Sequence, residues 1–226
     1  MKPTVLIIGF VYPEPNSSAA GTRMLQLINF FNDQNYKIVF ATTCKKSDNA
    51  FDLESLNVQI VNILLNDSSF DVFAKELDPK IVLFDRFMTE EQFGWRIMEN
   101  CPNALRILDT EDLHFVRKTR SLALNYQEIC SDDFLSNEIT KREIASLYRC
   151  DLSLIISESE FKILVDKFKV DSTLLLYLPF MLDTNQNLKI NRLKSFENRF
   201  DFVSIGNFLH SPNLDAVSYL KKDIWH

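Results

Sequence analysis

The stretch TVLIIGFVYPEPNSSAAGTRMLQLINFFN, residues Thr4 to Asn32, decides the fold of this chain. Its first seven residues are almost entirely apolar and predict a buried β-strand. A polar loop comes next, and Ser17 or Ser18 near its end can cap a helix. The helix is expected to run from Ala20 to Asn32, because apolar residues recur there at helical spacing, at Met24, Leu27, Ile28 and Phe31. A strand followed by a helix with one apolar face is the repeating unit of a parallel α/β sheet.

The same alternation of strand and helix continues outward from this stretch. Further strand-like runs follow, namely KIVFATT, VQIVNIL, IVLFDRF, LRILD, DLSLIIS and TLLLYL. Helical segments are expected between them, at Phe70–Leu77, Glu90–Glu99, Asp132–Arg149 and Glu160–Phe168. This rhythm predicts an α/β fold, a Rossmann-like parallel sheet with helices on both faces, and we expect it to occupy residues 1–182.

The last part of the chain has the pattern of a second, incomplete domain. Residues 183–199 are polar and lack an apolar stripe, which is typical of a linker. In residues 200–226, the run FDFVSIG predicts a strand at Phe200–Gly206, and a helix is expected to follow with Ser211 as its N-cap. One strand and one helix cannot bury their own apolar faces, so we expect residues 200–226 to begin a truncated domain. The alternative is that the pair docks onto the first domain through the helix stripe of Leu214, Val217, Leu220 and Ile224.

Composition and charge exclude several classes of protein. The chain carries 31 acidic and 25 basic residues and a net charge of -6, which provides no broad positive surface for nucleic acid. Its longest apolar runs are far shorter than the roughly 18 residues of a membrane span, so we expect no transmembrane segment. The N-terminus lacks a secretory signal, which favours a cytoplasmic location and leaves peripheral contact with the inner membrane surface open. No zinc site or disulfide is expected, because Cys44, Cys101, Cys130 and Cys150 form no Cys-x-x-Cys pair.

Ligands of open α/β sheets bind beyond the carboxyl ends of the strands, so we first consider the loop after the first strand. This long loop delivers Gly21, Thr22 and Arg23 into the first helical turn, close to Ser18. Backbone amides, the helix dipole and a guanidinium together suit a phosphate or sugar hydroxyl groups. The loop matches neither the GxGxxG nor the Walker pattern, which disfavours classical dinucleotide and NTP sites. The alternative is a structural loop in which the glycine serves helix packing.

A dense set of polar residues follows the fifth strand, in the segment LDTEDLHFVRKTR. A carboxylate or imidazole there could orient an acceptor hydroxyl group, and the arginines could bind phosphate. The spacing fits no standard metal motif. The alternative is the start of a helix, with Asp109 or Thr110 as N-cap and acidic residues in its first turn. The candidate residues of this segment are Asp109, Glu111, Asp112, His114 and Arg117.

Polar residues also follow two other strands. Asp85 and Arg86 end the fourth strand, and Ser157, Glu158 and Glu160 follow the sixth, so both sets could line the same cleft. Their alternative role is that of ordinary caps and turn residues. Gly206 and His210 lie in the turn after the last predicted strand.

Several of these segments together resemble GT-B glycosyltransferases of the family-4, or group 1, type. The resemblance is carried by SSAAGTR, DTEDLHFVRKTR, ISESE and GNFLHSPNLDAV, and it extends over essentially the whole chain. It implies two Rossmann-like domains facing a cleft, of which the first binds mainly the acceptor and the second the sugar nucleotide. Transfer in this family usually retains the anomeric configuration and generally needs no metal, so no cofactor is expected besides the nucleotide-sugar donor.

The resemblance also implies roles for single residues. Gly21 and Arg23 would lie near the donor phosphate and the acceptor. Asp109 occupies the position at which many relatives carry a histidine that contacts the transferred sugar, whereas the histidine of this chain comes five residues later, as His114. Both residues therefore stay candidates for the sugar contact.

The family's donor-binding acidic motif and pyrophosphate contacts have no counterpart in residues 200–226. We expect a glycosyltransferase fragment, inactive alone, whose parent transfers a sugar from a nucleotide-sugar donor to a glycan or lipid-linked acceptor. A separate donor-domain polypeptide could complete it. The alternative is a truncated, non-catalytic domain that binds a glycan or a partner protein.

Overall fold

The computed structural model describes residues 2–126, 137–181, 194–208 and 211–225. By its internal contacts the chain divides into two compact units, Met1–Met181 and Leu182–His226. The strands of the first unit are β1 (Thr4–Gly9), β2 (Lys37–Thr42), β3 (Gln59–Asn62), β4 (Ile81–Asp85), β5 (Leu105–Asp109), β6 (Leu152–Ile155) and β7 (Leu175–Tyr177). Its longer helices are α1 (Ala19–Asp33), α2 (Ser69–Leu77), α3 (Arg86–Asn100), α4 (His114–Tyr126) and α5 (Glu138–Arg149). Shorter helical segments are η1 (Leu53–Leu56), α6 (Glu158–Lys162), η3 (Ile163–Lys167) and η4 (Ser172–Leu174).

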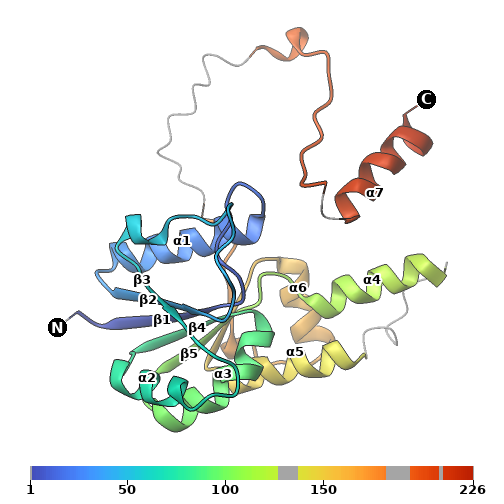
Figure 1. Cartoon of the computed structure of the whole chain (residues 1–226). Helices are drawn as coiled ribbons and strands as arrows, with labels where there is room; N and C mark the ends of the chain where they lie inside the picture. Colours follow the sequence, from blue (N-terminus) through green and yellow to red (C-terminus); the bar gives the residue numbers. More distant parts are fainter. Residues whose placement is uncertain (1, 127–136, 182–193, 209–210, 226) are drawn as a thin grey trace. The chain divides into compact units, whose positions relative to one another are not determined.

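In the part of the chain that the structure describes, seven strands form one parallel sheet in the order β3-β2-β1-β4-β5-β6-β7. The seven strands predicted within residues 1–182 and the Rossmann-like α/β fold are therefore confirmed (Figure 1). The chain runs from β1 outward to β2 and β3, and then crosses to β4 on the other side of β1. This reversal creates a switch point between β1 and β4, and ligands of such sheets bind there, beyond the carboxyl ends of the strands.

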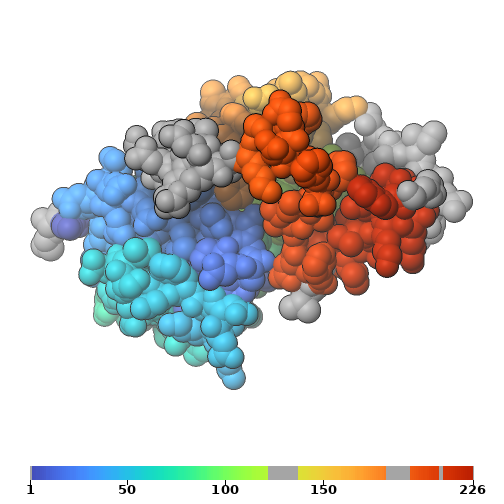
Figure 2. All heavy atoms as spheres, turned by 90° about the horizontal axis from the view of Figure 1, so that it is seen from above, coloured from blue at the N-terminus to red at the C-terminus, as the bar shows by residue number. Residues whose placement is uncertain are grey.

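Apolar residues cover both faces of the sheet, as expected for parallel strands buried on both sides. In β1, Leu6 and Ile8 belong to one core, whereas Val5 and Ile7 belong to the other. Figure 1 shows α1 on one face and α2, α3 and α5 on the opposite face. On the α1 face, η1 lies beside α1, where the Asn32 side chain donates to the Leu56 carbonyl at 3.1 Å (Figure 2).

The helices differ from their predicted bounds at several ends. Helix α3 begins at Arg86, directly after β4, rather than at Glu90. The helix predicted at 160–168 starts earlier, as α6, and continues as the π-helical turn η3. Of the helix predicted at 132–149, the part from Glu138 is present as α5, and residues 132–136 lie outside the described residues. No helix of the described part is long and apolar enough to cross a bilayer.

The second unit contains η6 (Phe196–Asn198), α7 (Ser211–Tyr219) and the π-helical turn η7 (Leu220–Ile224). The predicted helix is present, and its stripe residues Leu214, Leu220 and Ile224 are exposed. The strand predicted at Phe200–Gly206 is wrong, because this run forms no strand and its apolar side chains are exposed. A strand needs a neighbour for its backbone hydrogen bonds, and the described residues of this unit supply none.

Candidate functional site

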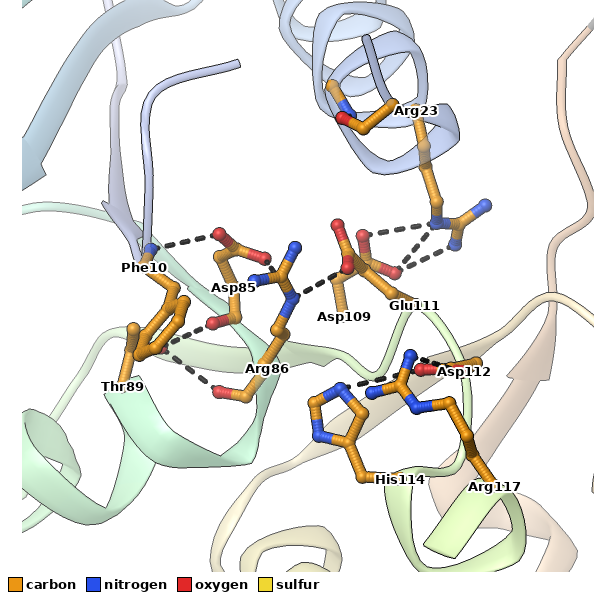
Figure 3. A network of polar contacts seen from close by, with 12 residues as sticks. Phe10, Arg23, Asp85, Arg86, Thr89, Asp109, Glu111, Asp112, His114 and Arg117 are labelled. Atoms are coloured by element: carbon orange, nitrogen blue, oxygen red, sulfur yellow. Dashed lines mark hydrogen bonds and ion pairs between the residues drawn. The ribbon is translucent and has the colours of Figure 1, made fainter. Parts of the chain in front are cut away.

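Polar side chains gather at the carboxyl ends of β4 and β5, beside the end of β1 (Figure 3). The strand register pairs Asp85, the last residue of β4, with Asp109, the last residue of β5. The β4 end also borders the switch point between β1 and β4. The structure brings to these two aspartates the side chains of Arg23, Arg86, Glu111, Asp112, His114 and Arg117.

Arg23 and Asp109 form a buried ion pair. Nε of Arg23 donates to both carboxylate oxygens of Asp109, at 2.9 and 3.1 Å, and Nη2 lies 2.8 Å from Oδ1. Nη1 donates to the carbonyl of Leu178, just beyond β7, at 2.8 Å. Burial raises the pKa of Asp109, and the Arg23 guanidinium opposes that rise. The pair holds α1 onto the sheet, and Arg23, which is 1% exposed, presents no group to a phosphate in this conformation.

The other residues of the predicted phosphate loop make contacts within the loop itself. The Ser18 hydroxyl accepts from the Gly21 amide at 3.0 Å, so Ser18 is the cap of α1. The Thr22 hydroxyl donates to the Pro15 carbonyl at 3.3 Å. Gly21 lies directly against Glu14, because a Cβ atom at Gly21 would come within 2.4 to 2.6 Å of three Glu14 backbone atoms. These contacts are those of the structural alternative, and a phosphate role for the loop stays a prediction.

Replacing Gly21 with alanine should destabilise the fold by about 1 to 3 kcal/mol, because the Glu14 backbone would have to move. The matched control is Gly94→Ala in α3, where the added Cβ would approach the end of the Glu90 side chain, at 2.5 Å, rather than a backbone. Urea unfolding followed by circular dichroism measures both losses. An equal or smaller loss for G21A than for G94A would show that the loop after β1 accommodates a methyl group.

Arg86 and Glu111 are paired, and both have a left-handed backbone. Their φ angles are 71° and 58°. Nε of Arg86 lies 2.6 Å from Oε2 of Glu111, and the two side chains are 14% and 12% exposed. A left-handed residue other than glycine costs roughly 1 to 3 kcal/mol and is typically found where a site requires it. Two such residues, following neighbouring strands and bound to each other, mark this edge of the sheet as a candidate binding site.

Asp85 is buried next to Arg86. Its Oδ2 accepts from the backbone amide of Phe10, the first residue after β1, at 2.9 Å. Its Oδ1 has no hydrogen-bond partner among the described residues, and Nε of Arg86 lies 3.7 Å away from it. Burial raises the pKa of Asp85, and the nearby Asp109 adds to that rise, while the Arg86 guanidinium and the backbone amides of Phe10 and Val11 oppose it. The carboxylate thus joins β4 to β1 through Oδ2, and within the described part of the chain Oδ1 makes only the longer ion-pair contact with Arg86.

Asp112 links His114 to Arg117. One carboxylate oxygen lies 3.4 Å from Nε2 of His114, and the other lies 3.0 Å from Nη1 of Arg117. Burial lowers the pKa of His114 to about 4, Asp112 opposes this, and the nearby Arg117 and Arg86 reinforce it. The imidazole is therefore neutral at pH 7. The approach to Asp112 favours a proton on Nε2, which leaves Nδ1 as the acceptor nitrogen.

The start of α4 is capped by glutamates from other helices. The Glu143 carboxyl group, from α5, accepts from the amides of His114 and Phe115 at 3.2 and 3.0 Å. Glu160, from α6, accepts from the Leu113 amide at 3.2 Å. The predicted cap at Asp109 or Thr110 is therefore wrong, because α4 begins only at His114 and these two carboxyl groups satisfy its first amides.

Glu143 is the residue of this region that sequence reasoning missed. It is 1% exposed, and burial raises its pKa to about 8. The sequence does contain a signal for it: Glu143 lies four residues after Ile139 and four before Leu147, a spacing that places all three on one face of the helix. A glutamate in the middle of an apolar stripe is expected to point into the protein.

The other predicted residues are Ser157, Gly206 and His210. Ser157 occupies the N-cap position of α6, and its Oγ lies 2.8 Å from Oγ of Ser159. Gly206 belongs to the second unit and is exposed, with Asn213 close to its Cα. His210 lies outside the described residues.

The charges of the cluster favour hydroxyl groups as ligands. Four carboxyl groups (Asp85, Asp109, Glu111 and Asp112) face three guanidinium groups (Arg23, Arg86 and Arg117), while His114 is neutral. Carboxylates and a neutral imidazole accept hydrogen bonds from hydroxyl groups. Within the described ranges, no group of three or more His, Cys, Asp or Glu residues could hold a metal ion.

The likeness of this chain to known proteins lies in the fold, and the first of the two structures below carries it. No family model matches the sequence, and no curated protein is detectably similar to it. The structure of sucrose-phosphate synthase from Thermosynechococcus elongatus matches 79% of this chain with a TM-score of 0.57 and 13% sequence identity. A proposed NAD-dependent epimerase/dehydratase from Methylobacillus flagellatus matches 74% of the chain and 59% of its own, with a TM-score of 0.41 and 10% identity. The present chain spans 48% of the sucrose-phosphate synthase, and at this identity the likeness shows the Rossmann-like fold alone.

Proposed function

We propose that this chain is the acceptor-binding part of a glycosyltransferase, which moves a sugar from a nucleotide-sugar donor to a hydroxyl group of a glycan or lipid-linked acceptor. Two observations support the proposal. The sheet is similar to that of sucrose-phosphate synthase, a GT-B glycosyltransferase. The second observation carries more weight, because a fold alone does not define an activity: groups suited to hydroxyl ligands cluster beside the switch point of the sheet.

Of the two candidates for the sugar contact, His114 fits this function better than Asp109. Asp109 is 0% exposed, and both of its oxygens are bound to Arg23. The side chain of His114 is 12% exposed, and its imidazole is neutral at pH 7. We therefore propose that His114 orients a sugar or acceptor hydroxyl group, whereas Asp109 positions α1 through Arg23.

The donor side of the reaction needs further groups. The leaving nucleotide develops negative charge that must be stabilised, and cations held in place serve that role without a metal. We propose that these groups belong to a donor-binding domain, either in the same polypeptide or in a separate one. Retention of the anomeric configuration and a cytoplasmic location belong to the same proposal, and a lipid-linked acceptor would place the protein at a membrane surface.

A His114→Ala variant should lower the rate of sugar transfer about 10- to 100-fold, because it removes one hydrogen bond that positions a reacting group. The assay uses protein purified from its own cells, a panel of nucleotide sugars, and glycan and lipid-linked acceptors, and it measures the nucleoside diphosphate released. Lys118→Ala, an exposed change on the same helix, is the matched control. Unchanged turnover in H114A would exclude His114 from the site. The absence of turnover with every donor, in a preparation that contains the donor-binding domain, would exclude glycosyl transfer.

A second candidate function is binding without transfer, either of a glycan or of a partner protein. It is favoured by the exposed side chains of Leu214, Leu220 and Ile224 in the second unit, since exposed apolar stripes often serve interaction. The assay of nucleoside diphosphate release distinguishes transfer from binding alone. Glycan binding without release of nucleoside diphosphate from any donor would support this second function.

A further inference from the structure

We propose that Asp85 binds a hydroxyl group of a neutral sugar acceptor, and that the Arg86 side chain is a movable cover over it. This inference rests on the glycosyltransferase function proposed above and names the acceptor class and the residue that recognises it. It starts from the position of Asp85 at the carboxyl end of β4, hydrogen-bonded to Phe10 at the carboxyl end of β1. The Asp85 carboxylate therefore lies directly at the switch point of the sheet, where ligands of such sheets bind.

The second observation is that Oδ1 of Asp85 makes no hydrogen bond among the residues that the structure describes and has only the 3.7 Å ion-pair contact with Arg86. The residue is 3% exposed. A buried carboxylate oxygen without a donor is costly, and native proteins rarely keep one unless a ligand or water satisfies it. A hydroxyl group is the matching ligand, because it supplies the missing hydrogen.

Arg86 is the group that lies over this oxygen. Its Nε is 3.7 Å from Oδ1 of Asp85 and 2.6 Å from Oε2 of Glu111, so the guanidinium lies between the two carboxylates (Figure 3). The Arg86 side chain is 14% exposed, and its backbone is left-handed, with φ at 71°. Moving the side chain breaks its ion pair with Glu111, but both side chains reach solvent and can exchange that contact for water. Displacement of Arg86 would expose Asp85.

The surroundings favour a neutral polyhydroxylated ligand over an anionic one. Asp85, Glu111 and Asp112 all act on Arg86, so an added anion would meet more negative than positive charge around this cation. Phe10 contributes apolar surface: its ring lies 5.3 Å from the guanidinium carbon of Arg86 and is 38% exposed. A sugar ring has an apolar C–H face that packs on an aromatic ring and hydroxyl groups that reach a carboxylate.

The test is binding to an array of neutral, carboxylated and phosphorylated glycans. Wild-type protein should bind neutral glycans in preference to the charged ones. Asp85→Asn should weaken that binding at least about tenfold, since a hydrogen bond to a charged acceptor is replaced by one to an amide. The fold should persist, because the asparagine oxygen can still accept from the Phe10 amide, and a melting curve checks this. Asp78→Asn, a change of an exposed carboxylate at the opposite end of β4, is the matched control.

A second variant separates the cover from the binding group. Arg86→Gly should bind neutral glycans at least as tightly as wild type, because glycine adopts the left-handed backbone freely and uncovers Asp85. A loss in R86G equal to that in D85N would overturn the cover and make Arg86 itself a ligand group.

The outcomes of the array separate this inference from the function on which it rests. Wild-type binding of neutral glycans that D85N retains would remove Asp85 and leave the proposed function standing. Preference for phosphorylated or carboxylated glycans would overturn the neutral acceptor class. Wild-type protein that binds no glycan of any kind would reject both the acceptor function and this inference.

Discussion

An Asp109→Asn variant should lose about 3 to 5 kcal/mol of unfolding free energy, because one half of a buried ion pair is removed. The asparagine leaves the Arg23 guanidinium buried without a counter-charge, and arginine cannot escape by losing its proton. The pair also joins three elements, since Arg23 comes from α1, Asp109 from β5, and Leu178 from the segment after β7. Urea unfolding at neutral pH, followed by circular dichroism, measures the loss.

Replacing the other partner of the pair, Arg23, should have a different effect. Arg23→Met should cost less than Asp109→Asn, because the stranded carboxyl group can take up a proton, and its cost should shrink further in acid. The double variant Arg23→Met/Asp109→Leu should regain most of the lost stability, since apolar groups of similar volume can replace a buried pair. Glu138→Gln, from an exposed pair with Lys141, is the control and should be nearly neutral. A D109N loss as small as that of E138Q would contradict the burial of the Arg23–Asp109 pair.

The sheet could be predicted from the sequence because its signals are local. Each strand is a short apolar run bounded by polar residues, and Thr4–Gly9 shows how such a run satisfies two cores at once. Parallel strands then place their carboxyl ends at one edge, so the positions of Asp85 and Asp109 follow from the strand bounds. The family resemblance seen in the sequence implies a Rossmann-like domain, and the parallel sheet of the first unit has that fold.

The partners within the site could not be predicted, because they come from distant parts of the chain. Arg23 and Asp109 are 86 residues apart. The position of Arg23, four residues before Leu27 of the apolar stripe, indicates an inward side chain, but nothing in either segment identifies Asp109 as its partner. The left-handed backbones of Arg86 and Glu111 are equally hidden, since neither is a residue type that favours this conformation. These are the positions at which local sequence rules fail, and such failures are typical of functional sites.

The predicted strand at Phe200–Gly206 failed for a different reason. Its alternating pattern describes a side-chain arrangement, whereas a strand forms only when a neighbour accepts and donates its backbone hydrogen bonds. The seven strands of the first unit have such neighbours, and the described residues of the second unit do not provide one. An alternating pattern alone therefore does not predict a strand, because a neighbouring strand must also be available.

Wild-type protein should become less stable as the pH rises from about 4.5 to about 8, and Glu143→Gln should remove much of that dependence. The carboxyl group binds its proton more tightly in the folded chain, where its pKa is about 8, than in the unfolded chain, where it is near 4.5. Its contribution is fully present below pH 4.5 and is lost as the pH passes through 8. One pKa unit corresponds to about 1.4 kcal/mol, so we expect Glu143 to account for a loss of about 2 to 5 kcal/mol.

The comparison of the two proteins isolates Glu143 from the other titrating groups. Burial also raises the pKa values of Asp85, Glu111 and Glu160, which act in the same direction and are common to both proteins. His114 acts in the opposite direction, because the stability that it contributes is lost as the pH falls from 6.5 to about 4. The Glu143→Gln variant should therefore still lose stability as the pH falls from 6.5 to about 4, because His114 is unchanged. It should lose less stability than wild type as the pH rises toward 8.

Urea unfolding at a series of pH values measures the loss of stability toward pH 8 and the loss toward pH 4. Glu138→Gln is the exposed control on the same helix. Glutamine can still accept one of the two α4 amides, so the variant should fold, at a modest cost that is independent of pH. Parallel stability curves for wild type and E143Q between pH 5 and 8 would mean that Glu143 is ionised in the folded chain. The cap of α4 would then consist of a carboxylate stabilised by the helix amides rather than a neutral carboxyl group.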